Sequence, residues 1–88
     1  MNALKKYPLT EGEVRASLEL TSMEVVDENE NIRYTTYGVR VMDESGNVLF
    51  NALDIDTRME YVEQFARLCV DNDVSILHLP DVLEDYMM

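Results

Sequence analysis

The feature that most constrains this fold is a change of hydrophobic period at Asp56. Before it, apolar and polar residues alternate, as they do from Val14 to Leu20, and this alternation is typical of a half-buried β-strand. Two further strands are predicted at about 32–42 and 48–55, each after a short polar cluster, DENEN and DESGN respectively. Short polar turns between consecutive strands predict an antiparallel meander.

Two places in the predicted strands indicate irregular pairing. Gly38 lies in the middle of the second strand, where a glycine often marks a bulge or a close neighbour. The alternation of the first strand becomes less regular between Met23 and Val26. We therefore expect a bulge or a bend there as well.

After Asp56 the apolar residues follow a helical period. Five of them between Val62 and Val70 fall on one stripe, which predicts an amphipathic helix. Thr57 followed by Glu60 predicts a capping box at the start of this helix. Asn72, which tolerates a left-handed conformation, predicts its end.

A second, shorter helix is predicted from Pro80 to about Met87. Proline is favoured at the first helical position, and Asp81 and Glu84 fall in the first turn, where the helix dipole favours carboxylates. The predicted fold class is therefore α+β. It is a three-stranded antiparallel β-meander followed by one long and one short helix packed on one face, in the order βββαα.

The domain organisation follows from the length of the chain and from Pro8. The 88 residues are enough for one domain and too few for two. Pro8 prevents a helix from continuing through the N-terminal segment and pushes Tyr7 toward extended backbone. We expect an N-terminal tail at residues 1–9 and a single α+β domain over residues 10–88.

Charge and cysteine content limit the partners and the compartment. The net charge of −11, with 18 acidic against 7 basic residues, disfavours nucleic acid and anionic membrane surfaces as partners and favours a basic protein. No lysine or arginine follows Arg67, so the C-terminal third is the acidic end. The single cysteine, Cys69, lies on the apolar stripe, where a thiol is inert and buried, and it cannot form an internal disulfide. Without a signal peptide or a long apolar run, these features predict a soluble cytoplasmic protein.

The one histidine, His78, precedes three carboxylates in ILHLPDVLEDYM. A metal site would need His78, Asp81 and Asp85 to converge, and their spacing of three and four would stack them on one helical face. Because Pro80 is expected to begin the helix, His78 lies outside it, and one nitrogen ligand is a poor set for zinc. The preferred interpretation is a structural role at the start of the helix.

No catalytic, cofactor-binding or metal-binding residue is predicted, and no cofactor is expected. With one histidine and one cysteine, catalysis would depend on carboxylates and tyrosines alone. Asp54 and Asp56 could hold Mg²⁺, but negative charge just ahead of a helix N-terminus also explains them and is the preferred interpretation. The candidate residues for an interaction or docking surface lie in or next to the acidic last helix: His78, Asp81, Glu84, Asp85 and Tyr86.

A Ser-x-x-His-Leu-x-Asp-Val-x-Glu-Asp-aromatic segment closes the chain, from Ser75 to Tyr86. It follows a strand hairpin, a polar turn at 54–57 and a helix around 65–69. In this arrangement the chain resembles a family of small bacterial domains of unknown function, over about residues 34–87. The resemblance implies no activity. It implies that the His–Leu–acidic segment is a family feature with a structural or docking role.

The third predicted strand, VLFNALDI, is apolar on both faces. Proteins normally cover such an edge strand, and two helices cover only one face of a sheet, so apolar surface is left over. Either a homodimer or another protein buries it, or the apolar residues of the tail fold back over it. We therefore expect a small acidic protein-protein interaction or regulatory module without catalysis. The alternative is a metal-dependent or carboxylate-based enzyme that uses His78, Asp81 and Asp85.

Overall fold

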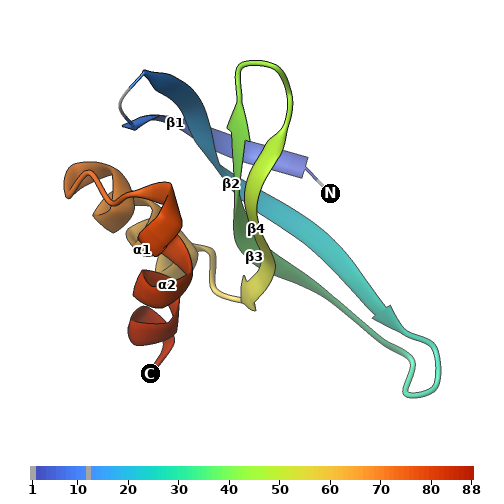
Figure 1. The fold of residues 1–88 in the computed structure, drawn as a ribbon. Helices are drawn as coiled ribbons and strands as arrows, with labels where there is room; N and C mark the ends of the chain where they lie inside the picture. Colours follow the sequence, from blue (N-terminus) through green and yellow to red (C-terminus); the bar gives the residue numbers. More distant parts are fainter. Residues whose placement is uncertain (1, 12) are drawn as a thin grey trace.

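An antiparallel sheet in the order β1-β2-β3-β4 forms one layer of the molecule, and two helices lie beside it (Figure 1). The computed structural model describes residues 2–11 and 13–88. The strands are β1 (Asn2–Glu11), β2 (Val14–Asp27), β3 (Ile32–Asp43) and β4 (Val48–Asp56). They are followed by α1 (Met59–Asp71), the 3₁₀ turn η1 (Ile76–His78) and α2 (Leu79–Met87). The predicted α+β class with an antiparallel sheet and two helices is confirmed. The predicted strand number is wrong, because the described residues form four strands and not three.

The additional strand, β1, is formed by the segment that we expected to be a tail. It pairs antiparallel with β2 along most of its length, for example through Lys5 opposite Leu20. Leu9 is only 5% exposed and Tyr7 packs against the core. Pro8 is compatible with this strand because β1 lies at the edge of the sheet, where one side of the backbone needs no partner. The segment therefore extends the sheet at its edge next to β2 and does not fold back over a face of the sheet, as we had considered.

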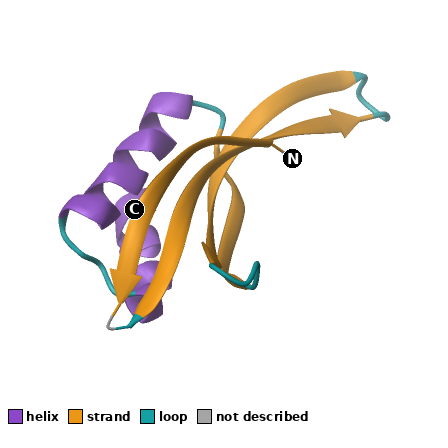
Figure 2. Cartoon of the chain, turned by 90° about the horizontal axis from the view of Figure 1, so that it is seen from above, coloured by secondary structure: helices purple, strands orange, loops and turns teal. Residues whose placement is uncertain are grey.

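One face of the sheet, the covered face, lies under α1, which contacts all four strands (Figure 2). The core fills the space between them. Its buried apolar residues are Leu9, Leu18, Leu20, Val39, Val41, Val62, Phe65, Ala66, Cys69 and Leu79. Lys5 of β1 donates a hydrogen bond to the Glu63 carboxylate and so ties the edge of the sheet to α1. The predicted apolar stripe, including the buried Cys69, is confirmed as the core side of this helix.

The opposite face of the sheet, the open face, has no helix over it in the described part of the chain, but its centre is covered by β4. Thr21 and Thr36 are fully buried there, and the backbone of Ala52 and Leu53 lies over Gly38. Alternation along the paired strands places these side chains on it: Lys6, Arg15, Glu19, Met23, Tyr34, Arg40 and Met42. Near its centre, Glu19 is only 4% exposed. Arg40 Nε donates to the Glu19 carboxylate at 2.9 Å, and Lys6 Nζ lies 3.5 Å from it. These two cations compensate the cost of burying the carboxylate.

β2 and β3 continue beyond the other strands as a two-stranded arm, residues 23–36, which projects away from the helices (Figure 1). The pairing of β1 reaches only to Ser22 of β2, and the pairing of β4 reaches only to Tyr37 of β3. Within the arm the pairing runs without a register shift from Met23 to Asp27. No bulge therefore interrupts the pairing of β2 with β3 near Met23, where we expected a bulge or a bend.

One irregularity of pairing lies between β3 and β4, at Gly38. The register of the two strands shifts between Tyr37 and Val39. A Cβ atom at Gly38 would lie 2.5 Å from the Cα atom of Leu53 and closer still to the carbonyl oxygen of Ala52. Only glycine permits this approach of two backbones, so the predicted bulge or close neighbour at Gly38 is confirmed.

Aspartates stabilise the β2–β3 and β3–β4 turns, as expected for the polar clusters. Asp27 Oδ1 accepts the backbone N–H of Asn29 at 3.0 Å. Asp43 Oδ1 accepts the backbone N–H of Asn47 at 2.8 Å, and the Asn47 side chain donates to Oδ2 at 3.0 Å. The side-chain hydrogen bond from Asn47, together with the backbone donors of the turn, lowers the pKa of Asp43. Gly46 supplies the left-handed residue of this turn, with φ of 89°.

α1 begins without the predicted capping box of Thr57 and Glu60. The N-cap residue is Arg58, one position later than expected, and its side chain makes no cap hydrogen bond. Asp56 takes over this role from outside the helix. Its carboxylate accepts the Arg58 guanidinium at 2.9 and 3.0 Å and the Arg58 backbone N–H at 2.8 Å, and these bonds lower the pKa of Asp56 to about 2. The carboxylate also lies where the helix dipole favours negative charge.

α1 ends at Asp71, next to the predicted Asn72, but the left-handed residue is a different one. Asn72 has φ of −103°, whereas Asp73 has φ of 49°.

None of the described helices is long and apolar enough to cross a membrane.

Candidate interaction site on the last helix

Two tyrosines hold α2 against α1. Tyr61 Oη donates to the backbone oxygen of Tyr86 at 3.1 Å, and Tyr86 Oη donates to the backbone oxygen of Tyr61 at 2.8 Å. The ring centroids of this pair lie 4.8 Å apart, and the Phe65 ring lies 5.2 Å from that of Tyr86. Burial raises the pKa of Tyr86. Tyr86, a predicted docking residue, therefore lies half-buried in the packing between the two helices.

The chain enters α2 through a capped turn. Ser75 Oγ accepts the backbone N–H of Leu77 at 3.3 Å and caps η1. Leu79, the first residue of α2, is fully buried, and Pro80 follows it in the first turn, one position later than the first helical position predicted for it. The buried leucine and the two tyrosines fix both ends of α2, so the outward side chains of the helix have defined positions.

The outer side of α2 carries a shallow apolar depression of about 420 Å³. Its lining consists of Pro80, Leu83, Glu84, Met87 and Met88. The spacing of Pro80, Leu83 and Met87 is that of residues on one helical face. Leu83 also packs on the core, whereas Met87 is 51% exposed, and Leu77, just ahead of the helix, is 82% exposed. Exposed apolar residues gathered in this way are typical of a binding surface.

Carboxylates occupy the same helix as this depression. Asp81, Glu84 and Asp85 are all exposed, and Glu84 lines the depression itself. The last turn of α2 contains no basic residue, so the negative end of the helix dipole adds to these charges. No lysine or arginine follows Arg67 in the sequence. The surface can therefore hold an apolar group that is flanked by cations.

His78 lies at the start of α2, as expected, but it does not cap the helix. It occupies the N-cap position, its side chain makes no cap hydrogen bond, and the residue is exposed. The described residues contain no group of three or more His, Cys, Asp or Glu side chains that could hold a metal ion. The structure thus places Asp81 and Asp85 on α2 and His78 at its N-cap, and the three side chains do not form a metal-binding group.

We expect His78→Ala to change the free energy of unfolding by less than about 0.5 kcal/mol, because the side chain is exposed and makes no cap hydrogen bond. Urea denaturation followed by circular dichroism measures this change. Ser75→Ala is the matched control: it removes the hydroxyl that caps η1 and should cost about 0.5–1 kcal/mol. A larger loss for His78→Ala than for Ser75→Ala would contradict the assignment.

A family model described as a family of unknown function matches residues 3–88. The match runs from β1 to the residue that follows α2. This chain belongs to that family, DUF6514. The DUF6514 match confirms the predicted resemblance to a family of unknown function and extends it toward the N-terminus to include β1. The C-terminal segment as a family feature and the bacterial origin stay predictions. No curated protein and no solved structure matches this DUF6514 chain.

Cys69, Asp54 and Asp56, the other candidate reactive side chains of the DUF6514 chain, are buried or have partners. Burial raises the pKa of the Cys69 thiol to about 11, so it stays protonated at neutral pH and is a poor nucleophile. Thr36 Oγ1 donates to Asp54 Oδ1 at 2.6 Å. Asp56 is engaged by Arg58, as described above. The pair of aspartates that could have held Mg²⁺ is thus used for strand and helix contacts.

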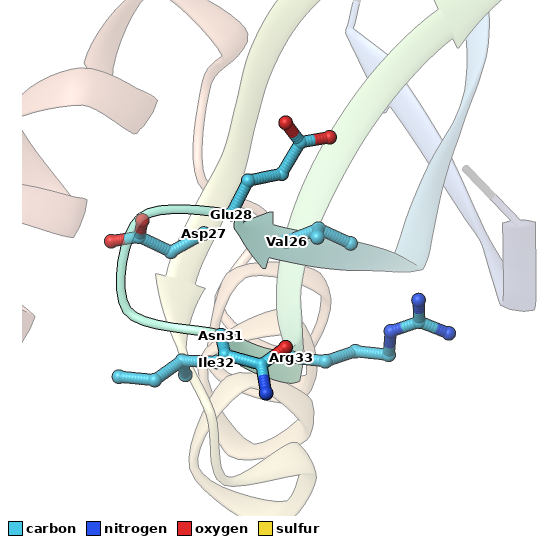
Figure 3. A pocket seen from close by; sticks show the side chains of 6 residues that line it. All are labelled: Val26, Asp27, Glu28, Asn31, Ile32 and Arg33. Atoms are coloured by element: carbon cyan, nitrogen blue, oxygen red, sulfur yellow. The ribbon is translucent and has the colours of Figure 1, made fainter.

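A second depression of the DUF6514 chain, of about 250 Å³, lies at the tip of the arm (Figure 3). It is lined by Val26, Asp27, Glu28, Asn31, Ile32 and Arg33. Sequence reasoning identified this stretch as a turn and missed the depression. The strand-forming residues on both sides of DENEN were the available signal, because they extend the hairpin well beyond the neighbouring strands.

Proposed function

We propose that this DUF6514 protein is a non-catalytic interaction module that binds a basic, amphipathic segment of another protein on α2. The observation that carries the proposal is the apolar depression of Leu83, Met87 and Met88 on a helix whose charged residues are all acidic. Apolar anchors of a partner would enter the depression, and its lysines or arginines would face Asp81, Glu84 and Asp85. This is the helix-in-groove mode of recognition, with charge setting the choice of partner.

Methionines suit such a surface. Met87 and Met88 are unbranched and polarizable, so they adapt to the shape of different apolar side chains. They are 51% and 94% exposed, so a partner can cover them without unfolding α2. The net charge of −11 also increases the rate at which a cationic partner is encountered.

The enzymatic alternative has no comparable support. His78, Asp81 and Asp85 are exposed side chains on one helix and its N-cap, and no described cluster around them could hold a metal ion. A general acid or base needs a defined position next to a reacting group, which is more readily provided by a partly enclosed site.

A labelled helical peptide tests the proposal. Its leucines would recur every third and fourth residue, with lysines at the other positions. A control peptide of the same composition would spread the leucines around the helix. We expect the first peptide to bind at least about tenfold more tightly than the second, equivalent to ~1.4 kcal/mol, and its affinity to fall as salt is added. Equal binding of both peptides, or no binding, would contradict the proposal.

Variants locate the binding surface. Met87→Ser combined with Met88→Ser should weaken binding about tenfold, because both apolar anchors of the surface are lost. Leu68→Ser is the control, since Leu68 is a 42% exposed apolar residue of α1 that does not line the depression. Similar losses for both variants would place binding elsewhere.

Charge-matched variants test the carboxylates separately. Glu84→Gln with Asp85→Asn should weaken binding and make it less sensitive to salt. Glu13→Gln with Glu44→Gln removes the same number of charges from exposed positions outside α2 and should have little effect. Fluorescence anisotropy of the labelled peptide measures its affinity for each variant. If both double variants weaken binding equally, the net charge and not this surface attracts the peptide.

A further inference from the structure

The lining of the α2 depression includes the two most exposed methionines that the structure describes. Met87 is 51% exposed and Met88 is 94% exposed, and both side chains line the depression. The other described methionines are Met23, Met42 and Met59, and each of them is partly buried. A small solute that reacts with thioether sulfur therefore reaches Met87 and Met88 more easily than the other three.

The single cysteine of the chain does not compete for such a solute. Cys69 is fully buried in the core, and burial raises the pKa of its thiol to about 11. Peroxides attack the thiolate form of cysteine, which is scarce at neutral pH when the pKa of the thiol is this high. The accessible oxidisable sulfur of the described residues therefore lies in the α2 depression.

Met87 and Met88 lie outside the hydrophobic core. The residues that pack against the core include Tyr86 of α2 but neither of these methionines. The position of α2 is fixed by the hydrogen bonds between Tyr61 and Tyr86 and by the buried side chain of Leu79. A polar group at position 87 or 88 therefore changes the surface of the depression and leaves the packing of the helix intact.

We propose that Met87 and Met88 form an oxidation site at which hydrogen peroxide regulates binding to the α2 depression. The regulation rests on the proposed function, because it requires the depression to be a binding surface. In the reaction a lone pair of the sulfur attacks one oxygen of the peroxide, and the S–O bond forms as the O–O bond breaks. The sulfur is oxidised to the sulfoxide and the peroxide is reduced. The proton of the transferred oxygen passes to the departing hydroxide, which leaves as water.

The sulfoxide makes the depression polar. Its oxygen accepts hydrogen bonds, and an apolar anchor of a partner would bury this oxygen without a donor, which costs free energy. α2 contains no lysine or arginine that could donate to the oxygen, and Glu84, which lines the depression, is a carboxylate. Thioether side chains therefore permit binding, and sulfoxides oppose it. Methionine sulfoxide reductases reverse the modification, so the two forms make a switch.

Peptide mapping by mass spectrometry tests the site independently of any binding partner. The full chain is treated with hydrogen peroxide and sampled over time. We expect sulfoxide to form at Met87 and Met88 at least about fivefold faster than at Met23, Met42 or Met59, because oxidation follows exposure. The chain oxidised at positions 87 and 88 should melt at nearly the same temperature as the untreated chain. Equal or faster oxidation of the three partly buried methionines, or unfolding of the oxidised chain, would overturn the proposal.

Binding of the amphipathic leucine–lysine peptide tests the regulation. Oxidation of Met87 and Met88 should weaken this binding about tenfold, because both apolar anchors become polar. The two classes of methionine sulfoxide reductase, one for each epimer of the sulfoxide, should restore the affinity. An untreated chain that does not bind the peptide would contradict the proposed function and the regulation with it. An untreated chain that binds the peptide equally well after oxidation would overturn the regulation alone.

Met87→Leu combined with Met88→Leu is the matched control, because leucine is apolar and contains no sulfur. Whatever the affinity of this variant for the peptide, hydrogen peroxide should leave that affinity unchanged. A loss in the variant as large as the loss in the natural sequence would place the sensitive group elsewhere in the chain and would overturn the proposal.

Discussion

Replacing Gly38 with alanine should strongly destabilise the protein. The added Cβ atom would meet the carbonyl oxygen of Ala52 and would lie 2.5 Å from Leu53 Cα. Both are backbone atoms, so β4 would have to move as a strand and could not yield by changing a rotamer. We expect a loss of about 3 kcal/mol or more in the free energy of unfolding, measured by urea denaturation.

Gly46→Ala provides the comparison for this prediction. Gly46 has φ of 89°, so alanine is strained there, but no atom outside its chain neighbours lies within 4 Å of the Cβ position. The expected cost is about 1 kcal/mol, from backbone strain alone. Equal losses for the two variants would show that the close approach of β4 to Gly38 is not what the substitution disturbs.

Phe65→Ala should be the most damaging substitution in α1. Phe65 is fully buried, is the largest side chain of the core, and packs against the ring of Tyr86 as well as under the sheet. The expected loss is about 3–5 kcal/mol, from lost burial and the cavity that remains. The total stability of a domain of this size is roughly 4–13 kcal/mol, so a large part of it would be removed.

Leu68→Ala is the control on the same helix, because Leu68 is 42% exposed and outside the core. We expect it to cost less than about 1 kcal/mol. Near-ultraviolet circular dichroism adds a second readout, since the Tyr61–Tyr86 contact should loosen only in Phe65→Ala. A small loss for Phe65→Ala would mean that α1 does not form the core as described.

Hydrophobic period predicted the larger part of this fold. It located β3, β4, α1 and α2 to within a few residues, because each has a clear apolar face that packs on the core. The start of α1 was less predictable. Thr57 and Glu60 have the spacing of a capping box, but Asp56 bonds the Arg58 backbone N–H, and Arg58, one residue after Thr57, is the N-cap.

β1 was missed because the signals of an edge strand resemble those of a tail. Pro8, Lys5 and Lys6 are typical of a segment without regular structure, yet proline and lysine are also how proteins protect exposed sheet edges. The alternation of Lys5, Tyr7 and Leu9 with the residues between them was visible in the sequence. Nothing in the sequence indicated that this segment would pair with the free edge of β2.

The candidate site was predictable in charge and not in shape. The acidic character of α2 follows directly from Asp81, Glu84 and Asp85. The role of Tyr86 depends on Tyr61, which is 25 residues away and is brought near only by the packing of the two helices. The strand-forming residues around DENEN indicated a long hairpin, but how far it projects depends on where the neighbouring strands end.

The strand order has a consequence for synthesis on the ribosome. Every strand pairs with the one made just before it, so the sheet can assemble hairpin by hairpin as the chain emerges. The residues of α1 follow all four strands, and until they emerge the nascent sheet exposes Leu18, Leu20, Val39 and Val41. The most aggregation-prone moment of this protein therefore comes late in translation, between the completion of β4 and the docking of α1.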